Sequence, residues 1–197
     1  MSSSPLLCFR QQKHRSLHFL HAAHVSQVVA ACDAAGITIA QLHGDGARRA
    51  LLQMPERIRA IYVLTADASG AITTPLPGEL NPDGNVNALA GEQGWRKAVD
   101  WLSRGRRTVD WLLVDGQVPG SGHAYDWRAL NVPKGASRKG WLLAGGLTPD
   151  NVGDALSAAR PDGVDVASGV AAADGVTKDP ALVTAFIEAA VNPSRRL

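Results

Sequence analysis

The stretch Lys139-Gly-Trp-Leu-Leu-Ala-Gly-Gly-Leu-Thr-Pro-Asp-Asn-Val152 decides the fold of this chain. Trp141–Ala144 is a short apolar run of the kind that forms a fully buried strand. Gly145-Gly146 lets the backbone turn, and Thr148-Pro149 predicts a helix with Thr148 at its N-cap and Pro149 at its first position. Glycine N–H groups and a helix N-terminus together favour an anion. The stretch therefore predicts a buried strand that leads into an anion-binding turn.

A second stretch of the same kind follows. Gly163-Val-Asp-Val-Ala-Ser-Gly169 predicts another buried strand, and Val152–Arg160 between the two strands has helical spacing. Two successive strand-to-helix loops that carry glycine, here Gly145-Gly146 and Ser168-Gly169, are where (β/α)8 barrels hold a phosphate. The alternative is that the glycines only make tight turns, as they do in any α/β protein. The pairing of the two loops favours phosphate binding.

The rest of the chain predicts strands that alternate with helices. We expect strands at Ile37–Gly44, Arg59–Leu64, Thr108–Val114, about 141–144 and about 163–167. We expect helices at Val25–Gly36, from Gly44 through about Gln53, at Trp95–Ser103, at Val152–Arg160 and at Pro180–Val191, with residues 65–94 as a long exposed loop. Five strands alternating with helices predict parallel pairing and an α/β fold.

The functional edge of such a sheet is the carboxyl end of its strands. Gln41 and His43, Asp115, Gly145-Gly146 and Ser168-Gly169 lie at these ends. A titratable carboxylate, an imidazole and two anion sockets together favour acid–base chemistry on a sugar phosphate. Cys32 shares the apolar face of its predicted helix, so we interpret it as a small core residue.

Composition limits the function classes. The chain has 197 residues, 45% of them hydrophobic, which is one domain's worth of core-forming sequence. Its formal charge is +2, but Arg10, Lys13 and Arg15 precede the first acid, Asp33, so the remainder is close to neutral. This balance argues against a nucleic-acid surface. The two cysteines are too few for a disulfide scaffold, and no stretch approaches the roughly 18 apolar residues of a membrane span.

Residues 1–24 differ from residues 25–197, and we treat them as a separate, non-matching segment. His14, His18, His21 and His24 would share one face of a helix, but they lack carboxylate or thiolate partners at suitable spacing. We therefore predict a solvated, irregular segment and no metal site. The Ser-rich, acid-free composition also fits an organelle transit peptide.

Residues 25–191 carry an ordered set of motifs. These are Gln41-Leu-His-Gly44, Leu113-Val-Asp115 with Gly120-Ser-Gly122 and Asp126-Trp127, Ala144-Gly-Gly-Leu147 with Asn151-Val152, and Gly163-Val-Asp-Val-Ala-Ser-Gly-Val170 with Lys178-Asp-Pro180. The set resembles phosphoribosylanthranilate isomerase, the (β/α)8 barrel of tryptophan biosynthesis, and is most similar to its plant and green-algal versions.

The resemblance implies a cofactor-free Amadori rearrangement of N-(5-phosphoribosyl)anthranilate. It assigns proton donation to Asp115, phosphate binding to Gly145, Gly146, Ser168 and Gly169, and anthranilate or sugar binding to Gln41 and His43. A structural hydrogen-bonding role for His43 remains the alternative. The resemblance also implies a plastid location, with the cytoplasm as the alternative.

The chain departs from the family at its start. The family's first strand, Lys-Ile-Cys-Gly, carries the cysteine general base, and Cys8 in Leu-Leu-Cys-Phe-Arg does not match it. An arginine of the second unit is also unmatched, and Pro119 replaces a glycine of the loop after Asp115. We therefore expect barrel strands four to eight only, with open edges available for self-association.

Two other functions compete with the isomerase. The first is a catalytically inactive, phosphate-binding half-barrel that assembles with itself or another chain. The second is the indole-glycerol-phosphate synthase reaction, which requires a lysine at a strand end. None of the predicted strands ends in one.

Overall fold

The computed structural model describes residues 10–11, 14–19, 25–74, 109–116, 125–132 and 135–192. The chain forms two compact units. The first comprises Met1–Leu64, Pro75–Leu112 and Pro133–Gly140, and the second comprises Thr65–Thr74, Leu113–Val132 and Trp141–Leu197.

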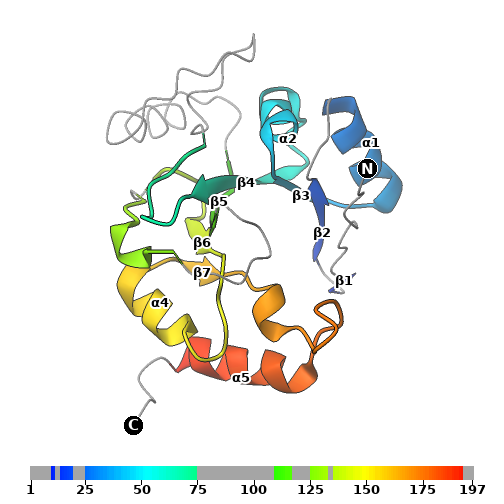
Figure 1. The fold of residues 1–197 in the computed structure, drawn as a ribbon. Helices are drawn as coiled ribbons and strands as arrows, with labels where there is room; N and C mark the ends of the chain where they lie inside the picture. Colours follow the sequence, from blue (N-terminus) through cyan, green and yellow to red (C-terminus); the bar gives the residue numbers. More distant parts are fainter. Residues whose placement is uncertain are drawn as a thin grey trace. The chain divides into compact units, whose positions relative to one another are not determined.

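The first unit is built on parallel strands (Figure 1). Strand β2 (His14–Phe19) pairs in parallel with β3 (Ile39–Leu42), which pairs in parallel with β4 (Arg59–Ala66). A two-residue strand, β1 (Arg10–Gln11), pairs antiparallel with β2. Helix α1 (Val25–Ala35) connects β2 to β3, and α2 (Asp45–Ala50) with the 3-10 turn Leu51–Gln53 connects β3 to β4. Parallel strands need such crossovers, so the expected alternation is confirmed here.

Strand β2 corrects one expectation. We predicted an irregular segment over residues 1–24, but the backbone of Ser16–Phe19 pairs residue by residue with Ile39–Leu42. Without this segment, the N–H and C=O groups along one edge of β3 would lack strand partners. Pairing with them stabilises residues 16–19 as a strand although their own sequence pattern is weak. His14 and His18 lie in this strand, so the helical face considered for a metal does not form there. His21 and His24 lie outside the described residues.

The core of the first unit lies between its helices and strands. Val28 and Cys32 are the buried residues of α1, one turn apart, and the helix is followed by Gly36 with φ of 62°. Cys32 is completely buried, which confirms its interpretation as a core residue. At the start of β4, the buried Asp110 carboxylate accepts the Ala60 N–H at 2.9 Å.

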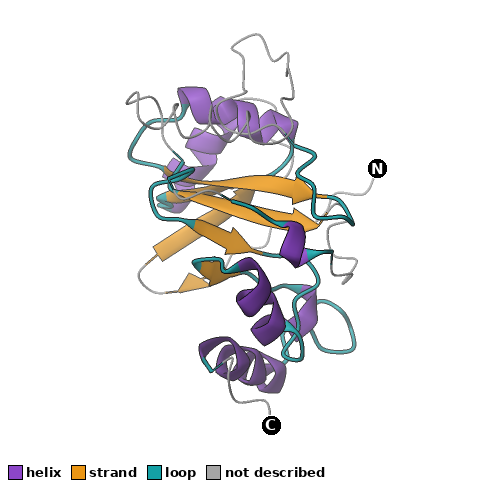
Figure 2. Cartoon of the chain, turned by 90° about the vertical axis from the view of Figure 1, so that its left-hand side faces the viewer, coloured by secondary structure: helices purple, strands orange, loops and turns teal. Residues whose placement is uncertain are grey.

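The second unit contains the end of β5 (Trp111–Gly116), β6 (Trp141–Leu143) and β7 (Gly163–Val164). Strands β6 and β7 are parallel, and Ala144 N donates to Val114 O at 2.8 Å. Helices α4 (Val152–Ala159) and α5 (Pro180–Val191) pack together on one side of these strands (Figure 2). The 3-10 turns η3 (Trp127–Ala129) and η4 (Ser168–Val170) complete the unit. All five strands expected from the sequence are therefore present as β3 to β7.

The helix after Gly145-Gly146 begins later than expected. We predicted Thr148 as its N-cap, but α4 begins at Val152. The Asn151 side chain accepts the Thr148 N–H at 2.8 Å and donates to Gly146 O at 2.8 Å. These two bonds hold Thr148–Asn151 as a separate turn, because a side chain that bonds nearby backbone groups competes with the helix.

The expected loop over residues 65–94 is partly wrong. Strand β4 continues to Ala66, and the chain then turns back, with Thr73 N donating to Thr65 O at 2.8 Å. Residues 75–94, the helix predicted at Trp95–Ser103 and the Gly-rich loop 117–122 with Pro119 lie outside the described residues. No helix among the described residues is long and apolar enough to cross a membrane.

Candidate functional site

Five of the seven predicted site residues lie in the second unit, at the carboxyl ends of its strands. Asp115 lies near the end of β5, Gly145 and Gly146 follow β6, and Ser168 and Gly169 follow β7 in η4. The other two belong to the first unit. Gln41 lies in β3 opposite Ile61 of β4, and His43 directly follows β3; both are half-buried.

Asp115 is half-buried, and its environment favours the protonated carboxyl. Burial raises its pKa above the ordinary value, and the nearby carboxylate of Asp165 adds to the shift. The Gly116 N–H donates to Asp115 Oδ1 at 2.8 Å and opposes it. A carboxyl whose pKa is raised by desolvation can hold a proton closer to neutral pH, as a general acid must.

Gly145 brings the first glycine loop directly against this carboxyl. Its φ is 86°, in the left-handed region. A Cβ at this position would lie 2.7 Å from Gly116 N and 2.9 Å from Asp115 Oδ1. Only glycine allows both the backbone conformation and this close approach.

Tyr125 joins the strands on either side of that contact. Its hydroxyl lies 3.2 Å from Val114 O and 3.1 Å from Ala144 O, and the single proton can be donated to one of them at a time. Burial raises the pKa of Tyr125, and the neighbouring Asp115 adds to the rise. Tyr125 therefore remains a neutral donor that fixes the ends of β5 and β6. The role of Tyr125 is not apparent from the sequence, although the residue directly precedes the Asp126-Trp127 motif.

Gly169 brings the second loop against the first. A Cβ on Gly169 would lie 1.8 Å from Leu147 O and 3.1 Å from Thr148 Cα. The turn of η4 therefore rests directly on the backbone that follows Gly145-Gly146. The two successive loops are therefore in contact, and their role in binding phosphate stays a prediction.

Asp165 and Lys178 extend the site, and the sequence analysis missed both as site residues. Asp165 directly follows β7 and keeps exposed surface. Burial of its carboxyl nevertheless raises the pKa of Asp165, and the Lys178 ammonium opposes the rise. Lys178 Nζ donates to Ala167 O at 2.8 Å. The available signal was the position of both residues inside the quoted motifs.

The described residues contain no cluster of side chains that could form a metal site. No group of three or more His, Cys, Asp or Glu side chains is placed there to hold a metal ion. The absence of a cofactor stays a prediction from the sequence.

Comparison with known proteins points to one family. The family model described as N-(5'phosphoribosyl)anthranilate (PRA) isomerase matches residues 92–189. A chloroplastic N-(5'-phosphoribosyl)anthranilate isomerase of Arabidopsis thaliana is 36% identical over 162 residues, covering 82% of this chain and 50% of the relative. The chain thus spans about half the length of that relative.

Solved structures similar to this chain belong to the same family. TrpF from Jonesia denitrificans is 31% identical, covers 91% of this chain and 71% of its own, and has a TM-score of 0.51. A phosphoribosyl anthranilate isomerase in complex with reduced 1-(o-carboxyphenylamino)-1-deoxyribulose 5-phosphate has a TM-score of 0.59 at 22% identity and covers 91% of this chain and 72% of its own. The second likeness shows the fold. With its ordered motifs, its parallel strands and these relatives, the chain belongs to the phosphoribosylanthranilate isomerase family and has the (β/α)8-barrel type of fold, of which it carries a part.

Proposed function

We propose that the chain converts N-(5-phosphoribosyl)anthranilate to 1-(2-carboxyphenylamino)-1-deoxyribulose 5-phosphate. The observation that carries this proposal is the position of Asp115. A half-buried carboxyl with a raised pKa lies directly against one glycine loop, and a second glycine loop rests on the first. An acid beside two adjacent anion sockets is the arrangement that this reaction requires.

Asp115 would act as the general acid. It gives its proton to the ring oxygen of the ribose as the bond between C1 and that oxygen breaks. The nitrogen lone pair of the substrate then forms a double bond to C1. Loss of a proton from C2 gives an enolamine with a double bond between C1 and C2, and the ketone of the product forms when C1 gains a proton and the C2 hydroxyl loses its own. The raised pKa of Asp115 supports the first step, because the acid must be protonated when the substrate binds.

The phosphate would bind at Gly145, Gly146, Ser168 and Gly169. Gly145 and Gly146 both have positive φ, at 86° and 66°, and the lack of a side chain lets a ligand approach their backbone N–H groups closely. Ser168 is exposed and Gly169 is half-buried, so this turn is accessible to a ligand. The solved relative bound to a 5-phosphate compound supports a phosphorylated ligand for this fold.

Gln41 and His43 are proposed to bind the anthranilate or the sugar, on the support of the Gln41-Leu-His-Gly44 motif. Alanine at either position is expected to raise KM more than it lowers kcat. Equal falls in kcat and kcat/KM for both variants would contradict this binding role.

The mechanism also requires a general base that removes the proton from C2. The family's cysteine motif is unmatched, and Cys8 lies outside the described residues. Comparison of Cys8→Ser with the unchanged chain tests whether this thiol removes the C2 proton. Losing a general base typically costs about 10²–10⁴-fold in rate, so an unchanged rate would exclude Cys8.

The direct test of the proposed function is the decay of substrate fluorescence with the purified chain. Turnover is expected with the unchanged chain and is expected to be lost in Asp115→Asn, which keeps an oxygen that can accept the Gly116 N–H. A folded chain without turnover would contradict the proposal.

A second candidate is a phosphate-binding half-barrel that pairs with another copy of this chain. The observation in its favour is the exposed apolar surface of α5, where Ile187 is 56% and Val191 is 71% exposed one helical turn apart. Such a patch favours association. Light scattering would separate a dimer from a monomer, and Ile187→Glu is expected to dissociate the dimer. A monomer at all concentrations would exclude this candidate.

We also propose a plastid location, on the support of the chloroplastic Arabidopsis relative and the acid-free composition before Asp33. Fusion of residues 1–32 to a fluorescent protein tests it in plant cells. Accumulation of the fusion in the cytoplasm would contradict it.

A further inference from the structure

The turn that carries Ser168 and Gly169 is held by the segment that follows it. Ala171 N donates to Ser168 O at 3.0 Å, and Asp179 N donates to Val170 O at 2.9 Å. Between these bonds the chain folds back on itself, with Ala171 bridged to Lys178. Both ends of this segment, Ala171 and Asp179, are therefore hydrogen-bonded to η4.

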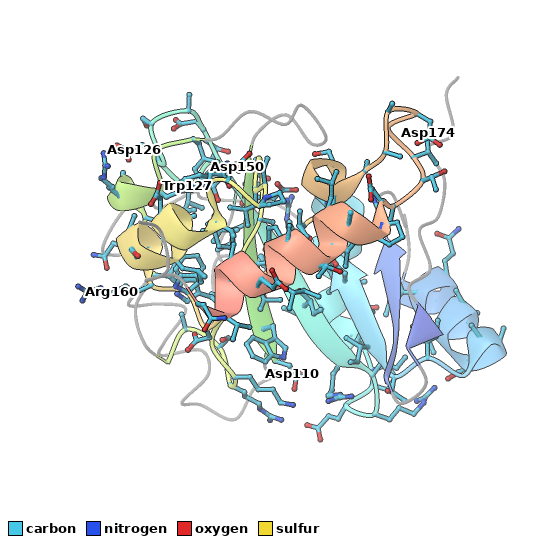
Figure 3. All side chains as sticks on the ribbon, turned by 90° about the horizontal axis from the view of Figure 1, so that it is seen from below. Asp110, Asp126, Trp127, Asp150, Arg160 and Asp174 are labelled. Atoms are coloured by element: carbon cyan, nitrogen blue, oxygen red, sulfur yellow. The ribbon has the colours of Figure 1, made fainter. Side chains whose placement is uncertain are left out.

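The far end of this folded segment is held by hydrogen bonds that do not involve Lys178. The Asp174 carboxylate accepts the N–H groups of Val176 at 2.9 Å and Thr177 at 2.8 Å, and the Thr177 hydroxyl at 2.6 Å. Asp174 lies in the loop that precedes α5 (Figure 3). The bond from the Thr177 hydroxyl, followed by the two N–H bonds, lowers the pKa of Asp174, and the Lys178 ammonium adds a smaller contribution in the same direction. The loop thus has its own internal support.

The side chain of Lys178 returns from this segment to the entry of the turn. Its Nζ donates to Ala167 O at 2.8 Å. The backbone of Ala167 has φ of −123° and ψ of −73°, outside the helical and extended regions, so local preference does not fix it. A charge-assisted bond to its carbonyl supplies that constraint.

The peptide geometry transmits this constraint to Ser168. The Ala167 C=O and the Ser168 N–H belong to one planar, trans peptide unit, so they point in opposite directions. When Lys178 holds the carbonyl toward itself, the Ser168 N–H points away from Lys178. A turn whose first N–H is fixed in direction is prepared to receive an anion before the anion arrives.

The positive charge of Lys178 also favours phosphate binding at this turn. Lys178 lies close enough to Asp165 to lower the pKa of that carboxyl. Because an ionised Asp165 beside the turn would repel a phosphate dianion, the ammonium offsets this repulsion.

We propose that Lys178 is a positioning residue for the phosphate of the substrate. It holds the Ala167 carbonyl and thereby orients the η4 turn, and its charge compensates Asp165. This inference rests on the proposed role of Ser168 and Gly169 in phosphate binding. It adds a residue that acts through that turn, at a position that the sequence analysis left without a role.

The test is a titration of the full chain with inorganic phosphate, followed at the Ser168 and Gly169 amides by NMR. Lys178→Met keeps the length of the side chain and removes its donor and charge, and it is expected to weaken phosphate binding about tenfold, the effect of losing one charge-assisted hydrogen bond. Lys178→Arg keeps both properties and is expected to restore most of the affinity. Lys139→Met removes an exposed lysine that precedes β6 and is expected to bind as the unchanged chain does.

Unchanged phosphate affinity in Lys178→Met would overturn the inference, and so would equal losses in the Met and Arg variants. If Lys178→Met does not fold, the unchanged chain decides, since the absence of a phosphate-dependent shift at the Ser168 amide overturns the inference as well. Turnover is measured separately, where Lys178→Met is expected to raise KM with little change in kcat. A chain that loses phosphate binding through Lys178→Met but shows no turnover in any form would refute the isomerase proposal and leave this inference standing.

Discussion

The substitution Gly169→Ala probes the contact that joins the two glycine loops. The added Cβ would lie 1.8 Å from Leu147 O, where about 3.0 Å is the practical lower limit. The loops would have to separate by the difference, 3.0 − 1.8, or about 1.2 Å. The obstacle is backbone on both sides, so a rotamer change cannot relieve it. We expect a loss of stability of about 3 kcal/mol, at the upper end of what overpacking typically costs.

Gly175→Ala is the matched control. Gly175 has φ of 70°, and a Cβ there would meet nothing within 4 Å. Alanine at this position carries only the strain of a left-handed backbone, about 1–2 kcal/mol. Urea unfolding measures both variants at constant m-value. Phosphate titration is expected to separate the two variants further, because Gly169→Ala displaces the proposed phosphate-binding turn and Gly175→Ala does not.

Equal stability and equal phosphate affinity of the two alanine variants would refute the reasoning. That result would mean that the loop containing Gly169 does not rest on Leu147 in solution. The proposed site would then lack the adjacency on which it depends.

Three further predictions follow from single contacts. Because the pKa of Asp115 is raised in the folded protein, the native state holds the carboxyl proton more tightly than the unfolded chain does. This contribution to stability is lost as pH rises above 3.8 through the folded pKa. Asp115→Asn is therefore expected to unfold at a higher urea concentration than the unchanged chain at pH 7, and to be no more stable than the unchanged chain at pH 3. Asp110→Ala leaves the buried Ala60 N–H without its carboxylate partner and is expected to cost about 1–3 kcal/mol in the same assay, whereas a change below about 0.5 kcal/mol would contradict the buried bond. Burial raises the pKa of the Cys32 thiol, so in a Cys8→Ser background it is expected to resist a thiol reagent at pH 8 until urea unfolds the chain; rapid labelling of the folded protein would contradict its burial.

The sequence predicts the strands well where apolar runs are bounded by glycine. Trp141–Ala144 appears as β6, and α5 has the predicted bounds, Pro180–Val191. The stretch after Pro161 forms a strand only at Gly163–Val164, β7, and this strand is half-buried, so the prediction of a longer buried strand is wrong. The Asp179 side chain accepts the Ala181 N–H, and Pro180 stands at the first helical position, so local signals alone define this helix start.

Tertiary contacts explain what the sequence does not predict. His14–Phe19 becomes a strand because β3 offers it a pairing edge, which no local pattern reveals. The start of α4 moves to Val152 because the Asn151 side chain bonds the preceding turn. Only the first departure depends on a partner distant in the sequence, because Asn151 bonds backbone groups three and five residues away and competes locally with the helix.

In the candidate site, too, some residues could be predicted from the sequence and others could not. Strand-end position and residue type were sufficient to identify Asp115 and the glycine loops. Tyr125 and Lys178 act through carbonyl oxygens, at Val114 or Ala144 and at Ala167, and backbone acceptors leave no pattern in a sequence.

The fluorescence decay of N-(5-phosphoribosyl)anthranilate with the purified 197-residue chain tests the central claim most directly. The account predicts measurable turnover by the unchanged chain and none above buffer in Asp115→Asn, with both proteins folded by circular dichroism. Turnover that survives Asp115→Asn, or a folded unchanged chain that binds phosphate without converting the substrate, would contradict it.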